Sequence, residues 1–310
     1  MAVQTAKAGT QSAGQPKPQR EVNIGGLTLP YMLVFPTLLL IVVIAVYPIL
    51  NSIYLSFIDN PLLQSGSKFV GLNNYAKILS DPVFRSAISN TVIFTIASVV
   101  LETILGLGVA LLINKTFPGR GLVRAAILVP WAFPTVVSAQ MWLLMYNDQT
   151  GIITYILQGL HLLAPGAALT ESTTGVLTAA IITDVWKTTP FMALLILAGL
   201  QLISADLYEA ASVDGSTRWQ QFWSITLPML KSSILIALLF RALDAIRAFD
   251  VFYVFGGNAV QSMGTYANFK LFGSTNIVFS QGVAAAIVVF IFGLVISLII
   301  VPLMRDTLRA

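Results

Sequence analysis

The chain has 310 residues, of which 56% are hydrophobic and only 10% carry a charge. Soluble globular domains carry about a quarter charged residues, so this composition excludes an ordinary soluble domain and indicates an integral membrane protein. The chain contains no cysteine, which excludes disulfides and cysteine-based metal or redox sites. The net charge of +4 is small, and we interpret it as a signal of membrane topology rather than of nucleic-acid binding.

The first 26 residues differ from the rest of the chain. They are rich in Gln, Lys, Gly, Pro, Ser and Thr and contain few large apolar side chains. Such a segment cannot bury enough surface to fold alone. We therefore expect a flexible cytoplasmic tail at 1–26, followed by a membrane domain at 27–310.

A helix needs about 20 apolar residues to cross the core of a bilayer, and six runs of the sequence reach that length. They are 29–57, 87–114, 122–146, 175–200, 232–255 and 282–303. The sequence therefore predicts an all-α integral membrane protein with six transmembrane helices.

An even number of spans places both termini on the same side of the membrane. That side would carry Lys7, Lys17, Arg20, Lys115, Arg120, Arg124, Arg218, Lys231, Arg305 and Arg309. The other side would carry only Lys68, Lys77, Arg85 and Lys270. Because cytoplasmic loops carry the excess of Lys and Arg, we expect both termini and the loop 201–231 in the cytoplasm.

The loop 201–231 carries local signals for a helix–turn–helix. Ser204 can cap a short helix that Gly215 ends, because glycine reaches left-handed backbone geometry without penalty. Thr217 and Gln220 have the spacing of a capping box, which would start a second helix.

One face of the first predicted helix is small and apolar, with Leu207, Ala210 and Ala211 at helical spacing beside Glu209. A small face permits the close approach of a partner, and a carboxylate offers an anchor for its donors. A solvated helix at the membrane interface has the same pattern. The local pattern therefore leaves a docking element and an interfacial helix both open.

Several charged residues lie inside the predicted spans, where charge is costly and is usually functional or paired. They are Glu102, Asp184, Lys187, Arg241, Asp244, Arg247 and Asp250. Arg241, Asp244 and Arg247 are three residues apart and form a polar stripe on the fifth span, as Asp184 and Lys187 do on the fourth. Lys187 and Asp244 fall at a similar depth, so the stripes could line a hydrated chamber.

A structural salt-bridge network between these two spans is the equal alternative. Arg247 and Asp250 are assigned to structural pairing because they lie nearer the outer end of the span. Glu102 has no local partner in the sequence, and we expect it to pair with a cation of the spans.

The run Glu209-Ala210-Ala211, then Asp214-Gly215, Ile225 and Leu227-Pro228, resembles the Glu-Ala-Ala loop of permease subunits in binding-protein-dependent ATP-binding-cassette (ABC) importers. Other stretches resemble the same family, which the chain is similar to from about residue 28 onward. They are 69–75, 128–134, 186–191 and 249–257. The chain departs from the family at Ser216, where Ala is common, and it lacks the usual Thr and Pro around Gly256-Gly257.

The resemblance points to the carbohydrate branch that includes maltose, trehalose and glycerol-phosphate permeases. It implies one transmembrane subunit of a sugar importer, which works by alternating access in a bacterial or archaeal cytoplasmic membrane. The expected substrate is a di- or oligosaccharide such as trehalose or maltose. The expected partners are ABC ATPase subunits, a second related permease and an extracytoplasmic sugar-binding protein.

The chain has no Gly-x-x-x-x-Gly-Lys-Ser/Thr phosphate loop. We therefore expect a non-catalytic permease that holds no cofactor, with ATP and Mg bound by the partner ATPase. No metal site is expected, since the one histidine, His161, stands alone in a predicted outer loop.

The resemblance also implies the site residues. Those expected to contact the sugar are Trp131, Thr135, Asp184, Lys187, Thr188, Phe191, Arg241 and Asp244. Those expected to couple to the ATPase, through the loop 204–228, are Glu209, Ala210, Ala211, Asp214 and Gly215. A neutral sugar needs partners for its hydroxyls and a flat apolar surface, and the first set offers charged groups and aromatic rings.

Two other classes of protein explain parts of the pattern. An autonomous secondary transporter could use the intramembrane carboxylates for ion coupling, but it needs no partner loop, and we see no clear inverted repeat. A membrane scaffold or enzyme would leave the polar stripes of the spans unexplained. Co-purification with an ATPase separates the importer from both.

Overall fold

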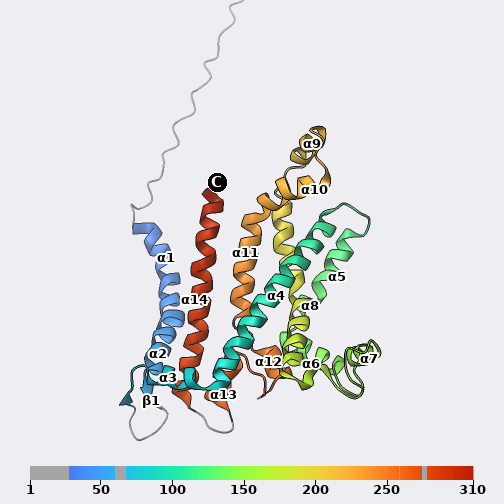
Figure 1. Cartoon of the computed structure of the whole chain (residues 1–310). Coiled ribbons are helices and arrows are strands. Elements are labelled where there is room, and N and C mark those ends of the chain that lie inside the picture. The colour runs from blue at the N-terminus through green and yellow to red at the C-terminus, as the bar shows by residue number, and fades with distance from the viewer. Residues whose placement is uncertain (1–27, 60–67, 258, 274–277, 310) are drawn as a thin grey trace, which may run out of the picture. The chain divides into compact units, whose positions relative to one another are not determined.

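Helices form most of the described chain in the computed structural model, which describes residues 28–59, 68–257, 259–273 and 278–309 (Figure 1). The all-α prediction therefore holds, apart from two short strands. The predicted tail at 1–26 lies outside the described residues. The chain divides into two units, Met1–Leu50 and Asn51–Ala310.

The first unit holds the start of the first predicted span. It contains α1 (Thr28–Ile41), the π-helical turn η1 (Val42–Val46) and the first residues of α2 (Tyr47–Ser56). In η1 the Tyr47 N–H donates to the Val42 carbonyl, just before Pro48. A proline ring clashes with the carbonyl four residues earlier, and a wider turn relieves that clash. The same arrangement recurs before Pro228, which follows the π-helical turn η3 (Phe222–Thr226).

The second unit contains the other elements. Its strands β1 (Ile58–Asp59) and β2 (Lys68–Phe69) pair antiparallel. Its helices are α3 (Asn73–Ser80), α4 (Pro82–Asn114), α5 (Arg120–Ala132), α6 (Thr135–Met145), α7 (Ile152–Gly159), α8 (Thr173–Leu200), α9 (Ala205–Val213), α10 (Arg218–Gln221), α11 (Leu227–Ala245), α12 (Asp250–Phe255), α13 (Met263–Phe272) and α14 (Phe279–Arg309), with a 3-10 turn η2 (Leu169–Glu171). Figure 1 shows α9 and α10 at one end of the long helices and α12 and α13 at the other.

Four helices of the described residues are long and apolar enough to cross a membrane. They are Tyr31–Ser56, Pro82–Asn114, Thr173–Leu200 and Phe279–Met304. A fifth span results if α5 and α6 are counted together, although they are bent by 90° at a break next to Pro134. The predicted count of six is therefore not confirmed by length and composition.

The predicted fifth span, 232–255, is wrong as one continuous helix. α11 ends at Ala245, and α12 starts only at Asp250. α11 also carries Lys231 and two further charged side chains within 19 residues, which makes it less apolar than the other long helices.

Side chains satisfy two carbonyl groups at the turn 246–249, where the helix ends. The Arg247 Nε donates to the Leu243 carbonyl at 3.0 Å, and the Ser262 hydroxyl donates to the Ala248 carbonyl at 2.6 Å. Arg247 thus follows the end of α11 and does not continue the stripe that the sequence predicted for it.

The two long helices α4 and α8 pack closely because Gly106 has no side chain. A Cβ at Gly106 would lie 2.8 Å from the Met192 Cβ and 3.1 Å from the Ala193 nitrogen, whereas a Cβ at Gly108 would have nothing within 4 Å. Gly106 therefore allows the close contact of the two helices, whereas Gly108 plays no part in packing within the described part of the chain. Gly282 behaves like Gly106, because its Cβ would meet α13 at Leu271.

The segment 69–75 folds back on the end of α2. The buried amide of Asn74 donates to the carbonyls of Ser56 and Ile58, both at 2.9 Å. The Tyr75 hydroxyl lies 2.7 Å from the Ser56 hydroxyl. The polar residues of the segment 69–75 that resembles the family therefore have a structural role: they hold the segment against the end of α2.

Asp81 ties α4 to α13 at the end of the helices opposite α9. Its carboxylate caps α4 through the Val83 N–H at 2.9 Å, accepts the Tyr266 hydroxyl at 2.8 Å and lies 3.7 Å from the Lys270 ammonium. Burial raises the pKa of Asp81, but the hydrogen bonds from Tyr266 and Val83 and the charge of Lys270 together lower it below its ordinary value.

We expect Gly106→Ala to lower the free energy of unfolding by about 1–3 kcal/mol, because the added methyl group overpacks the contact of α4 with α8. Gly108→Ala is the matched control on the same helix, and it should be neutral or stabilising by about 0.5–1 kcal/mol. Thermal unfolding of the two purified variants measures the difference. Equal melting temperatures would contradict the close contact at Gly106.

Candidate functional site

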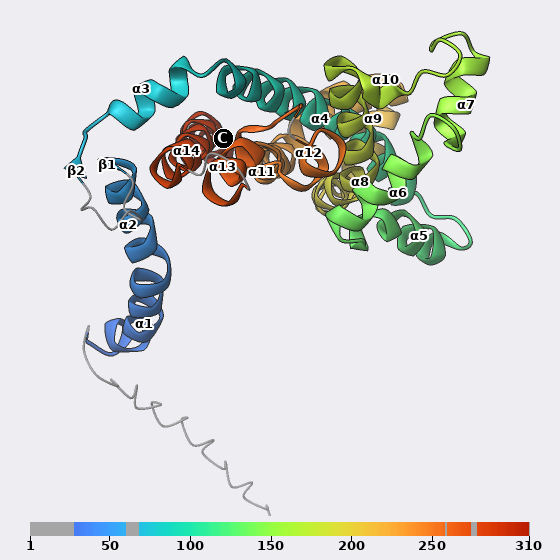
Figure 2. The same ribbon diagram turned by 90° about the horizontal axis from the view of Figure 1, so that it is seen from below.

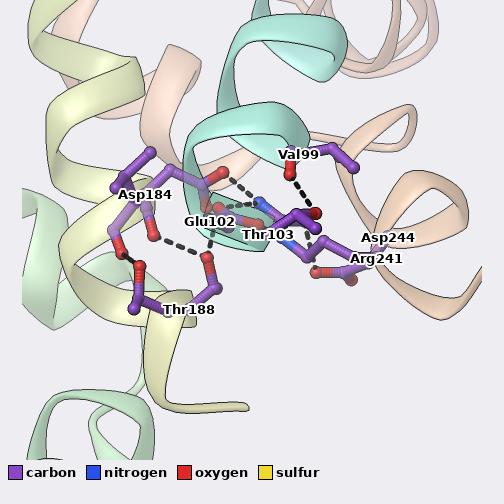
Figure 3. Close-up of polar contacts among 9 residues, drawn as sticks. Val99, Glu102, Thr103, Asp184, Thr188, Arg241 and Asp244 are labelled. Carbon is purple, nitrogen blue, oxygen red and sulfur yellow. Dashed lines mark hydrogen bonds and ion pairs between the residues drawn. The ribbon is translucent and has the colours of Figure 1, made fainter. Parts of the chain in front are cut away.

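The guanidinium of Arg241 in α11 is buried among three carboxylates (Figure 3). Only 2% of Arg241 is exposed, and Glu102 is fully buried. The Nε and Nη2 donate to the two carboxylate oxygens of Glu102 in α4, and Nη2 also donates to Asp184 in α8. Nη1 donates to Asp244 at 3.1 Å, one turn along α11. These four side chains, which we call the arginine clasp, join three helices.

Thr188 of α8 completes the clasp. Its hydroxyl contacts Glu102 Oε1 and the Asp184 carbonyl, the latter at 2.6 Å. The predicted pairing of Glu102 with a cation of the spans is thus confirmed. The salt-bridge network that the sequence left open is present, and it includes α4 as well as α8 and α11.

The charges of the clasp do not cancel. One guanidinium faces the two buried carboxylates of Glu102 and Asp184, and the third carboxylate, Asp244, has 65% of its side chain exposed. Removing one partner of a buried ion pair leaves an uncompensated charge, which costs more than the intact pair contributes. The clasp is therefore a fixed point that holds α4, α8 and α11 in register.

A cavity of about 280 Å³, which we call the chamber, lies beside the clasp. Its lining residues are Phe94, Thr135, Asp184, Lys187, Thr188, Arg241, Asp244, Ala245, Arg247, Ala248, Phe249, Asp250 and Val251. The wall includes acidic and basic side chains in equal number. Thr135 reaches it because the bend after α5 starts a new helix at that residue.

The chamber gathers most of the residues predicted to contact a sugar. Those lining it are Thr135, Asp184, Lys187, Thr188, Arg241 and Asp244. Trp131 and Phe191 are not among the lining residues. Their rings stack on each other instead, with centroids 5.7 Å apart and planes at 14°.

Lys187 differs from Arg241 in its freedom to bind. Within the described residues, no hydrogen bond or ion pair holds the Lys187 ammonium, although Asp184 lies near enough to interact with its charge. Arg241 by contrast uses all three of its nitrogens in the clasp. The chamber therefore has one occupied cation and at least one available cation.

Sequence reasoning missed Phe249 and Asp250 as parts of this wall, whereas Arg247 belonged to the predicted polar stripe. It gave Arg247 and Asp250 a structural role near the outer end of the span, whereas the turn 246–249 brings both to the chamber. No glycine or proline marks that turn in the sequence. The one available signal was Asp250 itself, since an acidic residue is favourable in the first turn of a new helix.

The predicted helix–turn–helix at 201–231 is present. Ser204 caps α9 by accepting the Asp206 N–H at 3.3 Å, and Gly215 follows the helix with φ of +82°. Thr217 and Gln220 form the expected capping box at the start of α10. The local sequence signals were therefore sufficient to predict this segment.

The α9–α10 hairpin is tied together and to the start of α11. The Gln221 amide donates to the Ser212 hydroxyl at 2.9 Å, and the Tyr208 hydroxyl lies 2.9 Å from that of Thr226. No residue of α9 is buried against the described part of the chain, and Glu209 and Ala210 are exposed. The hairpin therefore projects as one body from the end of α8 and α11 (Figure 1).

Comparison with known proteins identifies a family and several relatives that this chain resembles. Residues 102–308 match the family described as binding-protein-dependent transport system inner membrane component. The chain is 41% identical over 284 residues to the trehalose/maltose transport system permease protein MalF of Thermococcus litoralis, covering 92% of this chain and 94% of that protein. It is 40% identical over 270 residues to the trehalose transport system permease protein SugA of Mycobacterium tuberculosis, covering 86% and 85%.

A solved structure has the same fold. It is the crystal structure of a bacterial ABC transporter involved in the import of the acidic polysaccharide alginate, which matches with a TM-score of 0.74 at 24% identity and covers 90% of this chain and 96% of that chain. The family match starts at Glu102 of the clasp and continues through the chamber and the α9–α10 hairpin. The chain therefore belongs to the family of inner membrane components of binding-protein-dependent transport systems, the permease subunits of ABC importers.

Proposed function

We propose that this chain is the transmembrane subunit of an ATP-driven sugar importer and forms half of its translocation pathway. The observation that carries the proposal is the chamber, because it collects polar residues from several spans around a buried clasp. The substrate is a di- or oligosaccharide such as trehalose or maltose. The names of the two relatives above support that choice of sugar.

Within this proposal the chamber residues divide into two roles. Arg241 is a positioning residue, since its nitrogens are occupied by the carboxylates of the clasp. Hydrogen bonds to the sugar hydroxyls come from Lys187, Thr135 and the exposed part of the Asp244 carboxylate, and Asp184 and Thr188 line the same chamber. The stacked pair of Trp131 and Phe191 offers an apolar surface to the sugar if its rings separate during the cycle.

The chain crosses the membrane six times in this proposal. The bent pair α5–α6 and the broken pair α11–α12 join the four helices that qualify by length and composition. Both termini and the α9–α10 hairpin lie in the cytoplasm, as the distribution of Lys and Arg supports. Glu209, Ala210, Ala211, Asp214 and Gly215 of the hairpin contact the ATPase.

The importer also needs partner subunits. ATPase subunits bind ATP and Mg, a second related permease supplies the other half of the pathway, and an extracytoplasmic binding protein delivers the sugar. ATP closes the ATPase pair, the hairpin moves with it, and the spans open outward. An ion-coupled secondary transporter finds no support, because the family is that of ABC importers and the clasp carboxylates are already held by Arg241.

The decisive test is the ATPase activity of the complex that forms when this chain is expressed with its partner subunits. In lipid, the complex should hydrolyse ATP faster when a binding protein loaded with trehalose or maltose is added, and the empty binding protein should stimulate it less. Purification without any ATPase, together with transport by this chain alone down an ion gradient, would refute the importer proposal.

The double variant Glu209→Ala, Gly215→Pro should uncouple ATP hydrolysis from transport. Proline fixes φ near −65° and so cannot adopt the φ of +82° that Gly215 has, and the exposed carboxylate is removed at the same time. The matched control is Glu171→Ala, Gly166→Pro, which alters an exposed acid and a glycine with φ of +80° in the segment before α8. Full coupling in the first variant would disprove the assignment of the hairpin.

Lys187→Met and Arg241→Met should differ in kind. Lys187→Met should raise KM for the sugar about tenfold or more, since a hydrogen bond to a charged group is worth about 1.5–3 kcal/mol, and leave the melting temperature unchanged. Arg241→Met should destabilise the complex by about 3–5 kcal/mol, because two carboxylates stay buried without their cation. Lys77→Met on the exposed surface of α3 is the control. An unchanged KM in Lys187→Met would remove Lys187 from the site.

A further inference from the structure

A second cavity of about 380 Å³ lies next to the chamber. It is formed by α13, α14 and the turn 246–249, and Asn268 and Ala286 line it. Figure 2 shows α13 against α14 at this end of the helices. Arg247 and Phe249 line both cavities. The turn 246–249 is therefore a shared wall between the chamber and this second space, which we call the outer cavity.

The ring of Phe249 is held in one orientation. Tyr253 stacks on it with centroids 5.3 Å apart and planes at 25°, and Phe269 stacks on Tyr253 at 5.9 Å and 23°. Phe249 therefore packs against Tyr253 and also lines both cavities. An aromatic ring with fixed orientation suits the flat apolar face of a sugar ring.

Polar groups with free hydrogen-bonding capacity lie beside that ring. Arg247 donates through its Nε to the Leu243 carbonyl, and within the described residues its two Nη groups make no hydrogen bond. The Asn268 amide likewise makes none in the described part of the chain. Guanidinium and amide groups beside an aromatic ring can serve sugar hydroxyls as donors, and the amide also as an acceptor.

The sizes of the cavities add a further argument. The chamber, at about 280 Å³, lies just below the range of about 300–1,000 Å³ that small-molecule sites occupy. It therefore suits one sugar ring better than two. The outer cavity of about 380 Å³ shares Arg247 and Phe249 with the chamber and adds volume for a second ring.

We propose that the outer cavity is a second sugar subsite, which holds one ring of a di- or oligosaccharide while the chamber holds the next. Phe249 supports the sugar at the boundary, and Arg247 and Asn268 bind hydroxyls of the outer ring. The inference rests on the proposed sugar-import function. With two subsites, this chain would itself distinguish a disaccharide from a monosaccharide.

The first test measures occupancy of the outer cavity. The chain has no cysteine, so Asn268→Cys places a single thiol in it. The assembled complex in lipid, with its binding protein and ATP, is labelled with a maleimide in the presence of trehalose, maltose or glucose. We expect a disaccharide at about twice its Kd or more to slow labelling of this chain about threefold or more, because the bound ring covers the thiol and the labelling rate follows the fraction of free sites. Glucose should protect less, and Glu171→Cys, an exposed position before α8, should show no protection.

The second test fills the cavity. Ala286→Trp adds a large ring to the α14 side of the outer cavity and leaves every chamber residue unchanged. It should lower kcat/KM for disaccharide transport about tenfold, whereas Val295→Trp, at an exposed position farther along α14, should leave kcat/KM unchanged. Asn268→Ala gives a second variant that cannot overfill the cavity, and it should lower kcat/KM about three- to tenfold.

The outcomes separate this inference from the proposed function. If Asn268→Cys shows no protection and neither Ala286→Trp nor Asn268→Ala affects disaccharide transport, while Lys187→Met does, the outer cavity is no subsite and the importer proposal stands. If the unaltered complex neither transports nor responds to any of these sugars, the proposed function fails, and the second subsite fails with it.

Discussion

The burial of Arg241 is the constraint on which the rest of the structure depends. A guanidinium withdrawn from water costs several kcal/mol unless its donors are matched, so its three carboxylate partners must stay in place. Glu102 and Asp184 come from two other helices, which means that α4, α8 and α11 cannot slide past one another while the clasp is intact. The close contact at Gly106 adds to this, since it brings α4 and α8 near enough for Glu102 and Asp184 to share one cation.

The clasp also decides what the chamber can offer to a ligand. Arg241 forms part of the chamber wall and adds positive charge to it, but its nitrogens already donate within the clasp. The groups that can bind a ligand lie around it, on Lys187, Asp244 and the turn 246–249. That turn exists because α11 ends at Ala245, one residue after Asp244. Because the helix ends there, Arg247 and Phe249 lie on a turn and not on the polar stripe of α11. Both residues line the chamber and the outer cavity.

Local sequence signals predicted the helices and the hairpin well, because caps and apolar runs act over a few residues. Ser204, Gly215 and the capping box at Thr217 all perform their expected roles. The break after Ala245 was not predictable, since no glycine or proline marks it and one of its carbonyls, that of Ala248, is satisfied by Ser262, fourteen residues further along the chain. The charged residues of the chamber were identified from their cost in a bilayer, but their pairing depended on tertiary contacts that only the fold reveals.

The same two helices connect the hairpin to the clasp. α8 ends at Leu200, twelve residues beyond Thr188, and α11 starts at Leu227, after the π-helical turn η3 that follows the hairpin. At a rise of about 1.5 Å per residue, the clasp lies roughly 20 Å from the hairpin along both helices. If the hairpin moves as we propose, its displacement acts on Asp184 through α8 and on Arg241 through α11, and the buried ion pair between these side chains links the two helices.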